Sequence, residues 1–155
     1  MGETKLHTKK TAGTHIRFVN ALLRDIVAIE QMIQGNLFES DNERIGAEQE
    51  VCIVTENFKP ADNSIELLNA IQHPQFTTEL AKYNIEINLL PQILQPGCFA
   101  AMENDLLEKY HLAAGHAANN NTKLVLAGIL PTISRNEISL DYLTPLERYH
   151  MLSKK

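Results

Sequence analysis

The sequence predicts an α+β domain in which an antiparallel sheet carries acidic side chains on a concave face and helices pack on the other face. The chain has 155 residues, of which 44% are hydrophobic, so it is long enough to form one sizeable core. Apolar residues recur at helical spacing in segments 15–34 and 98–118. Between these helices, segments 44–54 and 76–90 read as strands that carry glutamates among their apolar residues, which is typical of a sheet with one exposed face.

The N-terminal part is expected to be an arm followed by a helix. Residues 1–14 are polar and lack a hydrophobic period, which predicts a flexible arm. Residues 15–155 are expected to form the domain, and its first helix ends at the stop signal Gly35-Asn36. One apolar face defines this helix: Val19, Leu22, Leu23, Ile26, Ile29 and Ile33.

The middle of the chain alternates strands with short connections. Arg44 to Val54 is expected to be the first strand, and residues 57–63 a turn before a short helix that ends at His73-Pro74. Phe76 to Leu90 contains the second acidic segment. A loop should follow it, because Pro91, Pro96 and Gly97 precede the long helix.

The C-terminal part is predicted to contain two strands and the start of a helix. Residues 124–130 are apolar on both parities, as expected of a strand covered on both sides, and residues 138–142 alternate apolar with polar. Thr144-Pro-Leu-Glu147 reads as a capping box with proline at the first helical position. The predicted helix is too short to be stable alone, so we expect the domain to continue beyond residue 155.

Composition argues against several classes of protein. The chain has 14 basic and 19 acidic residues and a net charge of −5, which argues against nucleic acid or an anionic membrane as the main partner. Its apolar runs fall short of the roughly 18 residues of a membrane span. Cys52 and Cys98 lack metal-ligand spacing and are expected to be small buried hydrophobes, which fits a reducing cytoplasm.

Glu48 and Glu50 are the first candidate site residues. A strand has a side-chain period of two, so both glutamates project from one face while Val51 and Ile53 project from the other. Two carboxylates 4 Å apart repel by roughly 1 kcal/mol in water, and by about 4 where the effective dielectric constant is near 20. A cation is therefore expected between them. Mg²⁺ prefers oxygen ligands and commonly bridges carboxylates to nucleotide phosphates, which predicts a nucleotide–metal site.

Glu79 and Glu86 are the second candidate pair. They lie seven residues apart, and one unbroken strand would place them on opposite faces. If both serve one site, the chain must turn or bulge between them, most plausibly at residues 82–84, so that they converge on Glu48 and Glu50. We expect their carboxylates to lie within about 12 Å of one another, the limit for one or two Mg²⁺ ions.

The same pattern also fits a sheet whose acidic face is simply solvated and has no function. Glu48 and Glu50 alone do not distinguish these interpretations. Gly46 shares their parity and favours a site, because a residue without a side chain lets a ligand approach the backbone closely.

The acidic segments resemble the family 2 glutamate–cysteine ligases and related ATP-dependent carboxylate–amine ligases. The resemblance spans roughly residues 44–152 and begins with Ile45-Gly-Ala-Glu-Gln-Glu50, which is similar to the Gly-x-Glu-x-Glu pattern of the family's first strand. The segment 77–88 resembles its second acidic block. Three further pieces follow in the family's order, namely 98–103, 124–128 and 145–149.

The resemblance implies part of a glutamine synthetase-like catalytic domain. It implies that Glu48, Glu50, Glu79 and Glu86 hold Mg²⁺, or Mn²⁺, against the phosphates of ATP. The implied reaction joins a glutamate-like carboxylate to a cysteine-like amine through an acyl phosphate, as in glutathione biosynthesis. Asn88 shares the parity of Glu86, and Arg148 is a basic residue in the last resembling piece; both are weaker candidates for substrate or phosphate contact.

This chain departs from the family in two ways. It reads Gly128-Ile-Leu-Pro-Thr132 where many members have Gly-Thr-His-Pro, so no histidine role is transferred. The family's later ligands have no counterpart, and the chain alone is therefore expected to be inactive. Association of identical chains is left open. The alternative is a regulatory or oligomerisation domain that keeps the fold without the chemistry. Two features of the sheet would favour this alternative: neutralisation of Glu48 and Glu50 by lysines or arginines, and the absence of a cleft.

Overall fold

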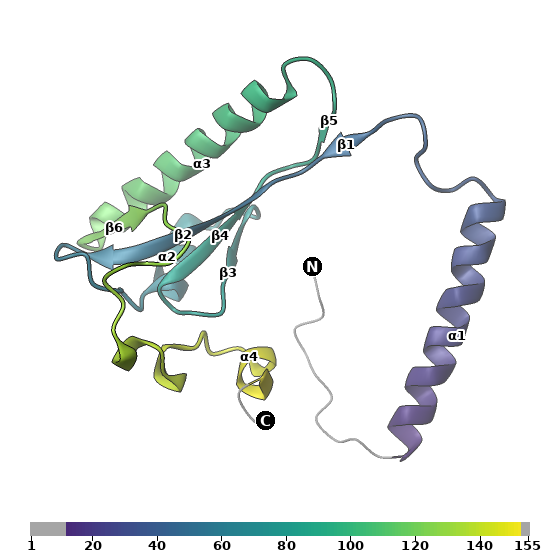
Figure 1. Cartoon of the computed structure of the whole chain (residues 1–155), viewed down its shortest axis with the longest axis horizontal. Coiled ribbons are helices and arrows are strands. Elements are labelled where there is room, and N and C mark those ends of the chain that lie inside the picture. The colour runs from purple at the N-terminus through teal and green to yellow at the C-terminus, as the bar shows by residue number, and fades with distance from the viewer. Residues whose placement is uncertain (1–11, 153–155) are drawn as a thin grey trace. The chain divides into compact units, whose positions relative to one another are not determined.

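The computed structural model describes residues 12–152 and divides the chain into two compact units, residues 1–43 and 44–155. The first unit contains helix α1 (Ala12–Gln34) (Figure 1). Residues 12–14 of the predicted arm belong to this helix, and residues 1–11 lie outside the described part. No helix among the described residues is long and apolar enough to cross a membrane.

Helix α1 ends as the sequence predicts. The Gly35 N–H donates to the Gln31 carbonyl and the Leu37 N–H to the Met32 carbonyl, both at 2.9 Å. Asn36 takes a left-handed conformation with φ of 50°, which closes the last turn in place of the usual glycine. The apolar side chains of α1 are exposed, from 37% at Val19 to 65% at Phe18. The prediction that this helix packs on the sheet stays a prediction.

The second unit is built on a four-stranded antiparallel sheet in the order β3-β4-β2-β6 (Figure 1). Its strands are β2 (Glu48–Thr55), β3 (Phe76–Thr78), β4 (Asn84–Asn88) and β6 (Thr122–Val125). A separate two-stranded ribbon pairs β1 (Arg44–Ile45) with β5 (Gln92–Ile93). The expected first strand, residues 44–54, is therefore divided at Gly46 and Ala47, and its two parts pair with different partners.

The core lies on one face of this sheet. Val51, Ile53, Ile85 and Ile87 alternate with the acidic residues and are completely buried. Helices α2 (Ser64–Ile71) and α3 (Cys98–Asn119) supply the opposing apolar side chains, as the sequence predicts for α3, whereas only the existence of α2 was predicted. The structure is thus α+β, with an antiparallel sheet that helices cover on one face.

Of the two strands predicted near the C-terminus, the first has other bounds and the second is wrong. The strand expected at 124–130 runs from Thr122 to Val125, and Leu126 and Ile129 are exposed, because β6 is an edge strand that ends there. The segment 138–142 contains the 3₁₀ turn Leu140–Tyr142 in place of a strand, and a second 3₁₀ turn precedes it at Arg135–Glu137. The Glu137 carboxylate accepts hydrogen bonds from the Ser134 N–H and hydroxyl, and this local capping box favours a turn over an extended strand.

The capping box predicted at Thr144–Glu147 is also wrong. Helix α4 (Glu147–Leu152) begins later, and the Thr144 hydroxyl donates instead to the carbonyl of Glu79, 2.5 Å away. The Thr144 N–H donates to the Leu80 carbonyl at 2.9 Å, and the Lys82 N–H to the Tyr142 carbonyl at 2.8 Å. Residues 141–149, which we call the C-terminal strap, are thereby tied to the segment between β3 and β4.

Candidate functional site

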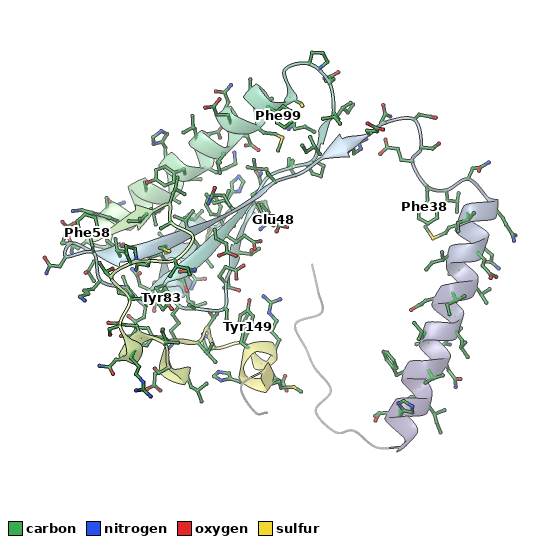
Figure 2. The ribbon with its side chains drawn as sticks, viewed as in Figure 1. Phe38, Glu48, Phe58, Tyr83, Phe99 and Tyr149 are labelled. Carbon is green, nitrogen blue, oxygen red and sulfur yellow. The ribbon has the colours of Figure 1, made fainter. Side chains whose placement is uncertain are left out.

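Four of the candidate residues and Thr77 share one face of the sheet, which we call the acidic face: Glu48, Glu50, Thr77, Glu86 and Asn88. Glu50 lies directly opposite Glu86 in the β2–β4 register, and Glu48 directly opposite Asn88. In Figure 2, Glu48 projects from the side of the sheet away from α3. The parity predicted from the sequence is therefore correct, since the residues between these acids face the core.

Glu79 and Glu86 are brought together by a turn, as the geometry required. Strand β3 ends at Thr78, Lys82 and Tyr83 form the turn, and β4 returns from Asn84. The side chains of Glu79 and Glu86 are hydrogen-bonded to each other, well inside the expected limit. A hydrogen bond between two carboxyl groups needs a proton on one of them, so the pair holds one proton where two free carboxylates would repel.

The environment places that proton on Glu79. Burial, the hydrogen bond to Glu86 and the charges of Glu86 and Glu50 together raise the pKa of Glu79 to about 7, against the lowering effect of the hydrogen bond from the Leu80 N–H. Burial also raises the pKa of Glu86, but hydrogen bonds from Glu79, Asn88 and Thr77 and the charge of Arg148 outweigh burial and hold it below its usual value. Glu86 is therefore the anionic member of the pair at neutral pH.

Hydrogen bonds along the face connect Glu86 to its neighbours. The Thr77 hydroxyl donates to the Glu86 carboxylate at 3.2 Å, and the Asn88 side-chain amide donates to the Thr77 oxygen at 3.1 Å. Thr77 lies opposite Glu86 in the β3–β4 register. Its role was missed from the sequence, where only the short spacing to Glu79 set it apart.

The C-terminal strap supplies a cation, Arg148, that acts on Glu86. Arg148 is half-buried, and its guanidinium donates to the Tyr149 hydroxyl at 2.5 Å and lies 4.5 Å above the Tyr149 ring. Tyr149 in turn donates to the Thr78 carbonyl at 3.4 Å. Both residues therefore lie against β3, and Figure 2 shows Tyr149 on the same side of the sheet as Glu48.

An open pocket of about 350 Å³ lies at one end of the acidic face. Glu48 and Asn88 line it across the sheet, together with Gly46, Ala47, Leu89 and Pro91. A Cβ atom added at Gly46 would meet nothing within 4 Å, so the glycine leaves open space beside Glu48 as its parity suggested. Glu48 and Glu50 are exposed, and the ion pairs formed by Lys109 and Lys123 in residues 12–152 involve neither of them.

The carboxyl groups of the acidic face meet some of the requirements of a hard divalent cation. Within residues 12–152, no three His, Cys, Asp or Glu side chains lie close enough together to hold a metal ion. The contacting pair Glu79–Glu86 nevertheless offers carboxylate oxygens next to an exposed glutamate. Mg²⁺ usually binds through one or two carboxylates and completes its shell with water and substrate phosphates, so such a pair suits it.

Cys52 lies on the same side of β2 as Glu48 and Glu50, but it is buried among apolar residues. It packs with Val54 and Leu130, and its thiol donates weakly to the Ala127 carbonyl at 3.8 Å. Burial and the charge of Glu50 raise the pKa of this thiol, which keeps it protonated. The prediction of a small buried hydrophobe is confirmed for both Cys52 and Cys98.

Comparison of the chain with protein-family models, with curated proteins and with solved structures finds no match.

Proposed function

We propose that this chain forms the nucleotide–metal part of an ATP- and Mg²⁺-dependent carboxylate–amine ligase of the glutamate–cysteine ligase type. The observation that carries the proposal is the contact between Glu79 and Glu86 on the face that also presents Glu50. Two carboxyl groups separated by a turn have been brought into hydrogen-bonding distance, where a divalent cation could replace their shared proton.

In this proposal each residue has a defined task. Glu48, Glu50, Glu79 and Glu86 would together hold Mg²⁺ or Mn²⁺ against the phosphates of ATP. An ion held there would neutralise phosphate charge during transfer to the carboxylate substrate, a step in which positioning and charge stabilisation matter most. Asn88, in the pocket, and Arg148, beside Glu86, contact phosphate or the small-molecule amino acid substrates.

The alternative is a regulatory or oligomerisation domain without chemistry. Such a domain would be expected to neutralise its acids with basic partners and to lack a cleft. Here Glu48 and Glu50 are exposed, and Glu48 lines a pocket. These two observations favour a ligand-binding site over a purely structural sheet.

The proposal is tested by titrating Mn²⁺ into the chain with and without ATP and following water-proton relaxation. We expect saturable binding that ATP strengthens and that the variant Glu48→Gln/Glu50→Gln loses, because ATP bridges through the metal to these carboxylates. Glu66→Gln/Glu103→Gln is the matched control. It removes two charges from exposed positions on α2 and α3 and should bind as the unmodified chain does.

Equal loss of binding in both variants would indicate a general effect of net charge and contradict the site. Saturable Mn²⁺ binding that ATP leaves unchanged would support a metal site but not a nucleotide site. A folded chain with no Mn²⁺ binding at all would favour the solvated acidic face.

A further inference from the structure

The polar side chains between Glu86 and α3 form a continuous series of hydrogen bonds. Beginning at the site, Glu86 accepts from Thr77, and Thr77 accepts from Asn88. The Asn88 backbone is then held twice by Gln75, whose carbonyl accepts from the Asn88 N–H at 2.7 Å and whose side-chain amide donates to the Asn88 carbonyl at 3.0 Å.

The far end of the series is anchored on α3. The Gln75 amide also reaches the Asp105 carboxylate at 3.5 Å, and Asp105 forms an ion pair of 3.1 Å with Lys109. Lys109 is only 7% exposed, although it is charged. Lys109 also pairs with Glu108 at 3.1 Å, so its ammonium group is held between two carboxylates of α3. The last partner in the series is therefore fixed to the core.

The direction of each hydrogen bond follows from the number of donors. The Asn88 amide can only donate through its nitrogen, so it occupies an acceptor position of the Thr77 hydroxyl. That hydroxyl has one hydrogen, which is then directed to Glu86. A carboxylate that accepts a directed hydrogen bond is held in one orientation, and supporting partners of this kind orient carboxylate ligands in metal sites.

We propose that Thr77 and Asn88 are positioning residues that hold the Glu86 carboxylate in the orientation in which it binds the divalent cation. The role rests on the function proposed above, since it assumes that Glu86 is a ligand. Thr77 acts through its hydroxyl, and Asn88 acts through its hydrogen bonds to Thr77 and to Glu86 itself.

The first test measures the affinity for Mn²⁺ alone. Thr77→Val preserves the shape and the strand preference of the side chain but lacks the hydroxyl, and we expect it to weaken Mn²⁺ binding about ten-fold, as is usual for such supporting residues. Thr77→Ser keeps the hydroxyl and should restore affinity to within about two-fold. A loss that serine does not restore would assign the effect to packing and overturn the proposal.

A double variant separates the two routes by which Asn88 supports Glu86. Thr77→Val alone keeps the direct hydrogen bond between Asn88 and Glu86, so Thr77→Val/Asn88→Leu should bind Mn²⁺ more weakly than Thr77→Val. Equal affinities of the two variants would mean that Asn88 does not hold Glu86 directly and would overturn its part of the proposal.

The second test needs no metal and separates this inference from the proposed function. Three-bond NMR couplings of the Glu86 side chain should report one rotamer in the unmodified chain and in Thr77→Ser, and averaged rotamers in Thr77→Val. Averaged couplings in the unmodified chain would overturn the positioning role. Ordered couplings that Thr77→Val averages, in a chain that binds no Mn²⁺, would establish the orientation of Glu86 and remove the metal from the proposed function.

Discussion

At the scale of single residues, the Glu79–Glu86 pair determines how the site responds to pH. Two neighbouring carboxylates can be stabilised by a shared proton or by a bound cation, and the proton and the cation exclude one another. At neutral pH the pair is close to the point of losing its proton, because the pKa of Glu79 is about 7. Metal binding should therefore release a proton below that pH and become tighter as the pH rises.

The same pair makes stability depend on pH. In the unfolded chain Glu79 has its ordinary pKa of 4.5, whereas in the folded chain the pKa is about 7. Between these values only the folded chain holds the proton, so its free energy of unfolding falls as the pH rises through this window. The lowered pKa of Glu86 acts oppositely, and its contribution is lost as the pH falls below 4.5.

The variant Glu79→Gln tests this expectation, because glutamine resembles the protonated acid at every pH. Urea unfolding at pH 5 to 8 without metal should show that its stability declines less than that of the unmodified chain, so that the variant is the more stable at pH 8. Glu66→Gln, at an exposed position on α2, should retain the original pH dependence. The same slope in Glu79→Gln as in the unmodified chain would show that the pair shares no proton.

At the scale of the elements, helices and strands were predicted most accurately where a regular hydrophobic pattern extends over many residues. The helices at 15–34 and 98–118 and the alternation around Glu48 and Glu86 could be recognised because every residue in them follows one periodicity. The turn at Lys82 was deduced from parity alone. These features include all four predicted acids, so the acidic residues of the candidate site could be predicted from the sequence.

The conformation of the C-terminal strap could not be predicted from the sequence, because it depends on contacts with distant residues. Thr144 has the residue type and spacing of a helix cap, but its hydroxyl binds the Glu79 carbonyl across 65 positions of the chain. Residues 138–142 have the alternation of a strand, but no neighbouring strand pairs with them, and backbone hydrogen bonds from Tyr142 to Ser139 and from Leu143 to Leu140 close a 3₁₀ turn there. A sequence pattern that covers only a few residues does not determine their conformation when other hydrogen bonds compete with it.

Thr144 should be the residue through which the strap supports the site. It is completely buried, and its hydroxyl is tied to the backbone at Glu79. Thr144→Val would leave that carbonyl without its partner, and we expect a loss of roughly 1–3 kcal/mol in the free energy of unfolding, measured with urea. The Mn²⁺ affinity should fall as well, because Glu79 loses its anchor.

Thr144→Ser is the control for this prediction. It keeps the hydroxyl and removes one methyl group, so it should retain the Mn²⁺ affinity even where packing costs some stability. Equal affinities in the valine and serine variants would mean that the strap does not position Glu79.

At the scale of the whole molecule, the candidate site and the main core belong to one unit. The core cluster draws its residues from β2, β3, β4, β6, α2, α3 and their connections, and the candidate acids all lie between residues 48 and 86. Arg148, which adds positive charge beside Glu86, also belongs to this unit. The residues proposed to bind the metal therefore all lie in residues 44–155, and residues 1–43 form a separate unit.

A chain that lacks residues 1–43 should consequently fold and keep its Mn²⁺ affinity. The exposed apolar side chains of α1 contribute nothing to the core cluster, and their removal should also reduce non-specific association, because large exposed apolar surfaces promote it. Urea unfolding followed by circular dichroism, together with the Mn²⁺ titration, measures both quantities. If the shortened chain were markedly less stable, the apolar face of α1 would have to cover part of the sheet unit, as the sequence pattern of residues 15–34 first suggested, and restoring residues 12–43 alone should then recover the lost stability.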